Sequence, residues 1–442
     1  MKNLHTLNLC ELTQAIRSGD ITCADYTRAC LTRIAQMEPQ VQAWAWLAPE
    51  RAMACAEQAD VQRVAGLLAG KPLGLLHGIP VGIKDIFNTA GIPTAMGSPV
   101  FAGNIPGESA EAVSRLEGAG AFVMGKTVTA EFAFLTPGKT RNPWNPAHTP
   151  GGSSSGSAAA VAAGFVPAAI GTQTNGSVIR PAAFCGVVGF KPSQGLISNR
   201  GIWSFSPSLD QVGIFTRSVA DAALLAAQLV ENPHDLAAAI VPLNTAPRLA
   251  AVRSPVWHLA TEAQQRRFAG NIAALSKAGA LIEEIELPAA FGDAHRAVRT
   301  IMLFEAAHGQ GFGELRSKHR EALSPLLNDF LDQGEQVSET AYHAALALRG
   351  RLKEELNSFM QRFDAIITPP ATGEAPRDLS STGDASFCTI WSLTGAPAIT
   401  IPAGLGPQGL PLGLQIVGAH LDDNRTLAVA QWCERLLESK SQ

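Results

Sequence analysis

Two serines and one lysine stand out in the sequence because their surroundings could place them together in an enzyme site. Gly-Gly-Ser153 and Asn-Gly-Ser177 both follow glycine, and Gly-Ile-Pro-Val-Gly-Ile-Lys84 lies upstream of them. A serine hydroxyl becomes an effective nucleophile only when a base accepts its proton. A lysine can be that base when burial keeps its amine neutral. The three side chains therefore form a candidate set for nucleophilic catalysis.

Both serines lie in a stretch of 38 residues, 142–179, that contains no Asp, Glu, Lys or Arg. The Gly- and Ser-rich run at 151–157 has the composition of a flexible linker. However, a small-residue helix is expected directly after it, over 158–163, and side chains typical of a protein core follow. The stretch is too rich in Gly, Ser, Pro, Thr and Asn to cross a membrane. We expect it to be buried, with backbone N–H groups that need partners or a ligand.

Two other patterns resemble binding motifs but have the wrong context. Residues 120–127 fit the phosphate-binding P-loop letter for letter. In a P-loop the residues between the glycines form a loop, whereas 121–124 read as a strand here. Glu305-Ala-Ala-His308 is a single E-x-x-H pair, and a di-metal helical bundle needs two such pairs plus two further Glu. We therefore expect neither nucleotide nor metal binding at these positions.

A third pattern imitates the nucleophile turn of α/β-hydrolases. Residues 152–156 fit G-x-S-x-G, and His420 lies downstream with several Asp between. That turn must follow a strand, yet 142–150 contain three prolines and cannot form one. An α/β-hydrolase triad is therefore not expected.

The string from 151 to 192 resembles the amidase signature family of serine hydrolases. The resemblance extends to Leu-His-Gly-Ile-Pro before Lys84, to Gly-Lys-Thr at 125–127 and to Leu-Thr-Gly-Ala-Pro at 393–397. It also takes in the segments 208–213 and 409–418, so that it covers nearly the whole chain. Around the nucleophile a malonamidase-like subgroup is the most similar. The resemblance implies an amidase, with no metal and no organic cofactor.

The resemblance also implies a role for each residue of the set. Ser177 would be the nucleophile that forms an acyl-enzyme, Ser153 a bridging serine held by a cis peptide, and Lys84 the terminal base. Lys84 would have to be neutral, so its pKa must lie below the usual ~10.4. Ser153 could pass a proton because a hydroxyl both donates and accepts. The oxyanion hole would consist of the backbone N–H groups of Thr174, Asn175, Gly176 and Ser177.

Three positions depart from the common family pattern, Gly-Thr-Asp-Thr-Gly-Gly-Ser followed by Ile-Arg. Gln173 replaces an Asp and Asn175 replaces a Gly, so that a side chain projects near the site. Arg180 lies three residues after Ser177 instead of two, as in the malonamidase-like subgroup, where the shifted Arg holds a substrate carboxylate. An Arg fork binds a carboxylate in a bidentate manner. We hypothesise a short carboxylate-bearing amide such as malonamate; the alternative is that Arg180 pairs with a buried acidic residue.

Three functions are compatible with these residues. The first is an amidohydrolase that releases ammonia from a small carboxamide. The second is the glutaminase subunit of a tRNA-dependent amidotransferase, which would need a partner protein. The third is a non-catalytic binding protein on the same fold, which a fluorophosphonate probe that fails to label Ser177 would favour.

Strands and helices alternate along the chain, and this mixture predicts an α/β fold with a central mixed sheet covered by helices on both faces. We expect one domain over 1–442, with N-terminal helices in 1–70, a catalytic core in 71–230 and the remaining sheet and pocket helices in 231–442. Periodicity and turn residues predict helices over 8–18, 24–37, 50–68, 109–118, 218–230, 261–278, 338–361 and 424–438, and strands over 78–83, 121–124, 365–367, 397–402 and 412–417.

Composition sets limits on partners and location. The net charge of −4 provides no basic patch for phosphate groups, so we expect a small-molecule amide substrate and no direct nucleic-acid contact. Only 16% of residues are charged, which predicts a large core and leaves room for a subunit interface, as in a homodimer. Seven scattered cysteines and an N-terminal segment without an apolar run favour the cytoplasm, away from membranes.

Overall fold

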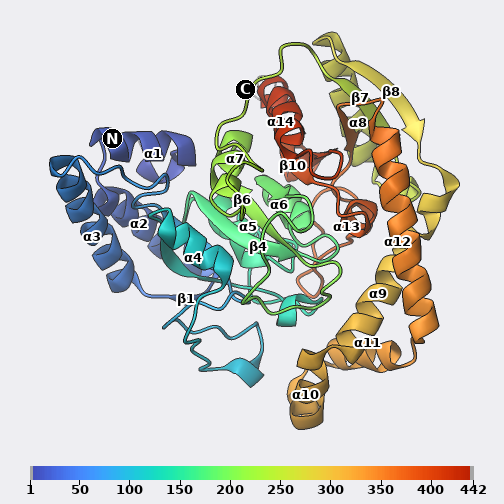
Figure 1. Cartoon of the computed structure of the whole chain (residues 1–442), viewed down its shortest axis with the longest axis horizontal. Coiled ribbons are helices and arrows are strands. Elements are labelled where there is room, and N and C mark those ends of the chain that lie inside the picture. Colours follow the sequence, from blue (N-terminus) through green and yellow to red (C-terminus); the bar gives the residue numbers. More distant parts are fainter. Residues whose placement is uncertain (1–2, 439–442) are drawn as a thin grey trace.

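One continuous sheet of 11 strands runs through the molecule, in the order β1-β3-β2-β4-β6-β5-β10-β11-β9-β7-β8. The computed structural model describes residues 3–438 (Figure 1). The strands are Trp44–Leu47 (β1), Pro80–Lys84 (β2), Phe122–Thr127 (β3), Ala168–Gln173 (β4), Val188–Lys191 (β5), Gln211–Thr216 (β6), Arg248–Arg253 (β7), Leu281–Glu286 (β8), Ala365–Thr368 (β9), Ala398–Leu405 (β10) and Pro411–Val417 (β11).

The sheet is mixed. Strand β2 pairs in parallel with both β3 and β4, and β7 pairs in parallel with β8 and β9. The pairs from β4 through β6, β5, β10 and β11 to β9 are antiparallel. The expected α/β class with a central mixed sheet is confirmed. The outermost positions of the expected domain, 1–2 and 439–442, lie outside the described residues.

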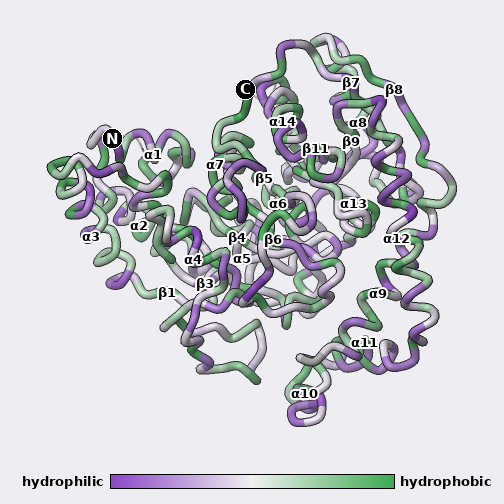
Figure 2. Tube along the Cα trace, viewed as in Figure 1, coloured by the Kyte–Doolittle hydropathy of each residue, from purple (hydrophilic) through white to green (hydrophobic). Residues whose placement is uncertain are grey.

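Helices cover this sheet, and the outer ones are amphipathic. They are Leu9–Ser18 (α1), Cys23–Val41 (α2), Pro49–Leu68 (α3), Glu111–Gly118 (α4), Ser155–Ala162 (α5), Ile179–Cys185 (α6), Val219–Ala227 (α7), Glu262–Lys277 (α8), Ala294–His308 (α9), Gln310–His319 (α10), Pro325–Glu335 (α11), Glu339–Met360 (α12), Thr389–Leu393 (α13) and Asp423–Glu438 (α14). Figure 2 shows hydrophilic and hydrophobic segments alternating along α12. No helix among the described residues is both long and apolar enough to span a membrane.

Helix α5 is short, built of small residues and buried throughout. A Cβ atom added at Gly156 would lie 2.3 Å from the backbone nitrogen of Val128 and 2.4 Å from the carbonyl oxygen of Ala43, so only glycine fits there. The helix therefore packs directly against backbone, next to β4 and α6 in the middle of the molecule (Figure 1). This close packing fixes where the preceding residues, 151–154, can lie.

Most of the predicted elements agree with the structure to within a few residues. The small-residue helix predicted over 158–163 begins earlier, at Ser155. The 38 uncharged residues are almost entirely buried, as expected. Segment 142–150 contains no strand, and 122–127 forms β3, so the arguments against an α/β-hydrolase turn and a P-loop are confirmed.

Candidate active site

Lys84 is the last residue of β2 and is fully buried. The strand before it is also completely buried, because β2 lies between β3 and β4 in the sheet. The Lys84 Nζ donates one hydrogen bond to Ser153 Oγ, at 2.9 Å, and another to Thr172 Oγ1, at 2.8 Å. The amine thus contacts two hydroxyl groups and no carboxylate, which leaves it free to lose its charge.

Burial lowers the pKa of Lys84 to about 7, and the charge of Asp210 opposes part of this shift. The neighbouring Asp85 does not pair with Lys84; its carboxylate lies 3.4 Å from the amine of Lys126 instead. An ordinary Lys84–Asp85 ion pair is therefore absent from the described residues. With a pKa near 7, a large share of the Lys84 amines is neutral at neutral pH and able to accept a proton.

Ser153 lies just before α5, and the peptide bond between Gly152 and Ser153 is cis, as the resemblance implied. Its carbonyl oxygen accepts a hydrogen bond from the N–H of Ala130, at 3.0 Å. The next residue, Ser154, donates from Oγ to the carbonyl oxygen of Thr172, at 3.1 Å. Segments after β3, before α5 and at the end of β4 are thereby joined around the Lys84 amine.

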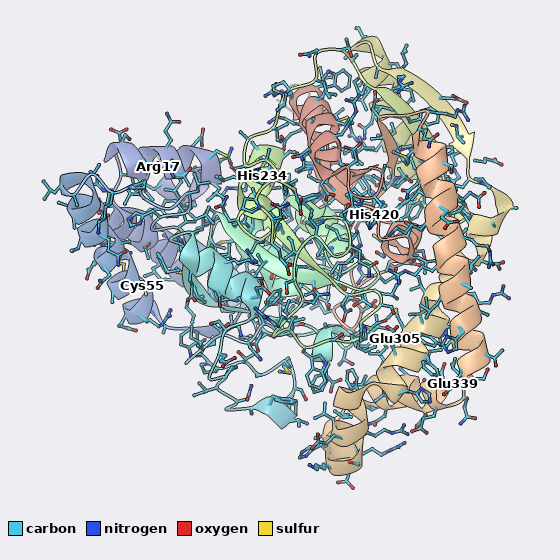
Figure 3. All side chains as sticks on the ribbon, in the orientation of Figure 1. Arg17, Cys55, His234, Glu305, Glu339 and His420 are labelled. Carbon is cyan, nitrogen blue, oxygen red and sulfur yellow. The ribbon has the colours of Figure 1, made fainter. Side chains whose placement is uncertain are left out.

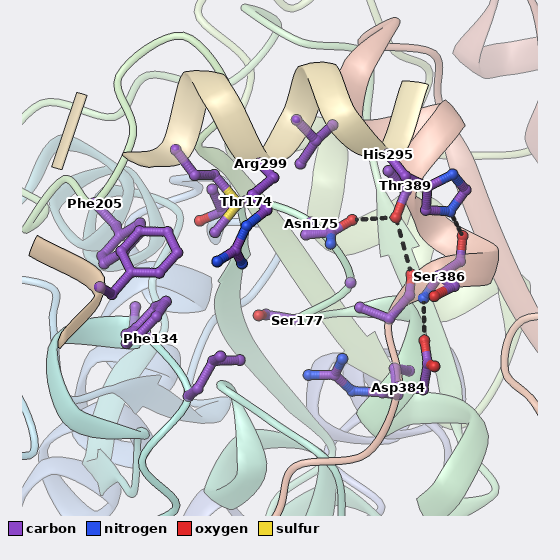
Figure 4. A pocket seen from close by; sticks show the side chains of 18 residues that line it. Phe134, Thr174, Asn175, Ser177, Phe205, His295, Arg299, Asp384, Ser386 and Thr389 are labelled. Carbon is purple, nitrogen blue, oxygen red and sulfur yellow. Dashed lines mark hydrogen bonds between the residues drawn. The ribbon is translucent and has the colours of Figure 1, made fainter. Parts of the chain in front are cut away.

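The loop 174–178 connects β4 to α6 and carries Ser177. The Oε1 atom of Gln173 accepts hydrogen bonds from the N–H groups of Val178, at 2.8 Å, and Ile179, at 3.0 Å, and so holds the loop closed. This arrangement explains how an amide at 173 can serve a loop that usually contains an Asp there. The Ser177 side chain points into a pocket (Figure 4).

Both side chains that precede Gly176 are anchored outside the loop. Thr174 Oγ1 donates to a carboxylate oxygen of Asp210, at 2.6 Å. Asp210 is buried and also accepts hydrogen bonds from residues 204–206. The Asn175 Oδ1 accepts a hydrogen bond from Thr389 Oγ1 on α13, at 2.9 Å (Figure 4). The Asn175 side chain thus packs against α13 and leaves the loop intact.

The pocket in front of Ser177 is a cavity of about 260 Å³ with aromatic, charged and backbone groups on its walls. All four proposed oxyanion-hole residues line it. The described residues that line it are Ala133, Phe134, Leu135, Thr174, Asn175, Gly176, Ser177, Arg180, Phe205, His295, Val298, Arg299, Met302, Phe330, Asp384, Ala385, Ser386 and Thr389. A pocket of this kind, largely apolar with a few polar groups converging on one hydroxyl, suits a small organic substrate.

Arg180 lines this pocket and is almost completely buried. Its Nη2 donates to the carbonyl oxygen of Gly152, at 2.7 Å, and to Thr382 Oγ1, at 3.1 Å. Its Nε has no hydrogen-bond partner, and within residues 3–438 the guanidinium makes no ion pair. Pairing with a buried acidic residue is therefore not what holds Arg180 in place.

The residues of the misleading motifs lie elsewhere and have other partners (Figure 3). Glu305 accepts hydrogen bonds from Ser206 Oγ, at 2.5 Å, and Tyr342 Oη, at 2.7 Å, while His308 stacks on Phe304. His420 contacts the amine of a lysine on α12 and no serine. In the described part of the chain, no group of three or more His, Cys, Asp or Glu side chains could hold a metal ion.

Sequence reasoning missed Thr172, Asp210 and Arg299 as site residues. Thr172 lies inside the uncharged stretch, next to the last residue of β4, so its position in the strand was a usable signal. Asp210 belongs to a segment that the family resemblance included without a role. Arg299 comes from α9, for which no helix was predicted, and its guanidinium points into the pocket (Figure 4).

Comparison with known proteins agrees with this geometry. The family model named Amidase matches residues 25–427. The chain belongs to the amidase family. A glutamyl-tRNA(Gln) amidotransferase subunit from Chloroflexus aurantiacus is 33% identical, and the alignment covers 100% of this chain and 99% of the relative. Like its relatives, this chain is an enzyme that acts on amide C–N bonds.

Solved structures place the amidase in the same group. The native peptide amidase from Stenotrophomonas maltophilia is 29% identical with a TM-score of 0.83, covering 98% of this chain and 97% of that one. A structure described as a vestigial protein complex that reveals the origins of an s-triazine catabolic enzyme has a TM-score of 0.87 at 26% identity, covering 98% of both chains. The amidase signature fold is therefore confirmed.

One expectation is wrong. We expected a small-molecule amide as the only substrate partner and no nucleic acid, but the curated relatives are named as subunits of an amidotransferase that acts on glutamyl-tRNA(Gln). The reasoning failed because net charge reports only on the phosphate-binding capacity of this chain's own surface. It says nothing about an assembly in which another protein contacts the nucleic acid. The relatives favour the second of the three functions considered above.

Proposed function

We propose that this amidase is the ammonia-releasing subunit of an amidotransferase-type assembly and that glutamine is its amide donor. One observation carries the catalytic part of this proposal: the buried Lys84 amine donates to Ser153 Oγ beside a pocket into which Ser177 points. The assembly and the donor are supported by the similarity to glutamyl-tRNA(Gln) amidotransferase subunits along the whole chain.

In the proposed reaction, Ser177 Oγ attacks the carboxamide carbon while its proton passes to Ser153, whose own proton passes to the neutral Lys84 amine. The carbonyl oxygen becomes negatively charged and is stabilised by the backbone N–H groups of the loop 174–177. When the tetrahedral intermediate collapses, the proton returns by the same route to the leaving nitrogen, and ammonia departs. The acyl-enzyme on Ser177 then reacts with water by the same steps, which regenerates the free serine.

Two arginines in the pocket could bind a carboxylate on the substrate. Arg180 is close to the loop that carries Ser177, whereas Arg299 lies on α9, which forms another wall (Figure 4). Glutamine separates its carboxylate from its carboxamide by three carbon atoms, and this favours Arg299 as the carboxylate ligand. A second candidate donor is a shorter half-amide of a dicarboxylic acid, because the free Nε of Arg180 would suit a carboxylate close to the reacting carbon.

An ammonia-release assay on the enzyme with its co-purifying subunits tests these assignments. For wild type we expect turnover of glutamine, and for Arg299→Gln we expect a KM for glutamine about 10-fold higher, because a charge-assisted hydrogen bond is lost. Arg296→Gln is the matched control, since Arg296 lies on the same helix but pairs with Asp293 at the surface. Turnover of malonamate but not glutamine, abolished by Arg180→Lys, would favour the second donor instead.

A further inference from the structure

Both unusual residues before the nucleophile, Gln173 and Asn175, form hydrogen bonds with a single serine of α13. The Gln173 Nε2 donates to Ser392 Oγ, at 2.9 Å. Ser392 Oγ in turn donates to the backbone carbonyl oxygen of Asn175. Ser392 is buried and lies two helical positions beyond Ile390, on the helix that backs the loop 174–178. The two departures from the family pattern are therefore connected through one hydroxyl group.

The chemistry of these groups fixes the direction of each hydrogen bond. The Gln173 Oε1 accepts from the N–H groups of Val178 and Ile179, so the other end of the amide must be the NH₂ group. An NH₂ group only donates, so Ser392 Oγ must accept from it. Ser392 has one proton, and this proton is left for the carbonyl oxygen of Asn175. A carboxylate at position 173 would compete for the same proton, because it only accepts.

The carbonyl oxygen of Asn175 belongs to the same peptide unit as the N–H of Gly176. In a planar trans peptide these two groups point in opposite directions. Holding the oxygen against Ser392, behind the loop, therefore directs the N–H of Gly176 away from α13. Gly176 lines the pocket, and within residues 3–438 its N–H donates to no backbone acceptor. That N–H is free to bind an oxygen atom of a substrate.

Packing leaves this peptide unit little freedom. A Cβ atom added at Gly176 would lie 2.9 Å from Cβ of Ala385 and 3.4 Å from Cβ of Cys388. The Asn175 side chain is held as well, by Thr389 Oγ1. Rotation of the unit would therefore have to break the hydrogen bond from Ser392 first.

We propose that Ser392, oriented by Gln173, is a positioning residue that aims the Gly176 N–H at the oxyanion formed on the substrate. The inference rests on the proposed function, since it requires amide cleavage at Ser177. It assigns a catalytic purpose to Gln173: the amide closes the loop with its oxygen and, with its nitrogen, directs the only Ser392 proton to the peptide that supplies the donor.

The test compares Ser392→Ala and Ser392→Thr with wild type. Removing one oxyanion donor typically costs about 10²–10³ in rate, and a misaligned donor should cost about 10-fold or more. For Ser392→Ala we expect kcat to fall by that amount while KM and Tm stay close to wild type. Ser392→Thr keeps the hydroxyl and should recover most of the rate. Thr394→Val is the matched control, because Thr394 Oγ1 donates only to the carbonyl oxygen of Ile390 on its own helix.

Gln173→Glu provides a second, independent variant. It keeps the acceptor for Val178 and Ile179 but claims the Ser392 proton, so it should slow the reaction about as much as Ser392→Ala. Combining Gln173→Glu with Ser392→Ala should add little further loss, because both changes release the same carbonyl oxygen. A double variant whose losses multiply would contradict the shared route.

The rate of fluorophosphonate labelling at Ser177 separates the failure of this inference from the failure of the proposed function. Phosphonylation also places negative charge on an oxygen in the oxyanion hole, and it does not require knowledge of the substrate. If wild type is not labelled at Ser177, the proposed function fails. If wild type is labelled and Ser392→Ala is labelled equally fast, only the positioning role of Ser392 is overturned.

Discussion

Ser177→Ala is expected to lower kcat/KM for ammonia release by about 10⁴-fold or more, because it removes the only atom placed to form the acyl-enzyme. The loss should appear in kcat, since binding in the pocket does not depend on this hydroxyl. Substrate affinity, measured by calorimetry with glutamine, should change little. Steady-state ammonia release over a range of enzyme concentrations gives the required sensitivity.

Ser155→Ala is the matched control for this prediction. Ser155 belongs to the same run of serines as Ser153, but its Oγ donates to the carbonyl oxygen of Val128 at the start of α5. We expect its activity to stay within a few-fold of wild type, as is usual for a substitution outside the reacting groups. Activity of Ser177→Ala within 10-fold of wild type would instead favour another nucleophile or a binding protein with contaminating hydrolase.

Lys84→Met is expected to lower kcat/KM by about 10³-fold, within the usual range for loss of a general base. Methionine fills nearly the same volume in the buried position but cannot accept a proton. Burial holds the pKa of Lys84 at about 7, so wild-type activity should fall as the pH drops below 7 and the amine becomes charged. Lys84→Met should retain a small activity that no longer falls over that range. Measuring kcat/KM from pH 5.5 to 9 for both proteins checks this.

A second buried lysine makes the control informative. Lys191 is fully buried, and burial lowers its pKa to about 7 as well. Its amine donates to Gln211 Oε1, at 2.7 Å, and to the carbonyl oxygen of Ala396, at 2.6 Å, and it does not line the pocket. Lys191→Met should lower stability yet keep the acidic decline in activity. A decline that disappears with Lys191 and persists without Lys84 would contradict the assignment of the base.

The sequence predicted the parts of the site that are encoded in short local strings. Lys84 ends a buried strand, Ser153 precedes a small-residue helix and Ser177 follows a glycine, and each of these features can be recognised within about ten residues. The residues that support them could not be predicted in the same way. Asp210 and Ser392 reach the loop from other parts of the chain, and only the packing of α13 and the loop after β5 against β4 brings them close.

Some elements were missed for identifiable physical reasons. Strand β4, Ala-Ala-Ile-Gly-Thr-Gln, has few residues with strand preference, and it is stabilised by lying between β2 and β6. A Cβ atom at Gly171 would lie 2.6 Å from Ser154 Oγ, so the strand must be small there. Strand β8 contains three Glu at the edge of the sheet and lacks a clear apolar alternation. Glycines at 309, 311 and 313 obscured the helical pattern between α9 and α10.

The rate at which a fluorophosphonate labels Ser177, followed by mass spectrometry as a function of pH, tests the proton relay most directly because it does not depend on substrate identity. We expect the wild-type rate to rise about tenfold per pH unit below pH 7 and to level off above it, as a single base loses its proton. In Lys84→Met the labelling should be slow and independent of pH across the same range. Equal pH dependence in both proteins, or a label on another residue, would contradict the account.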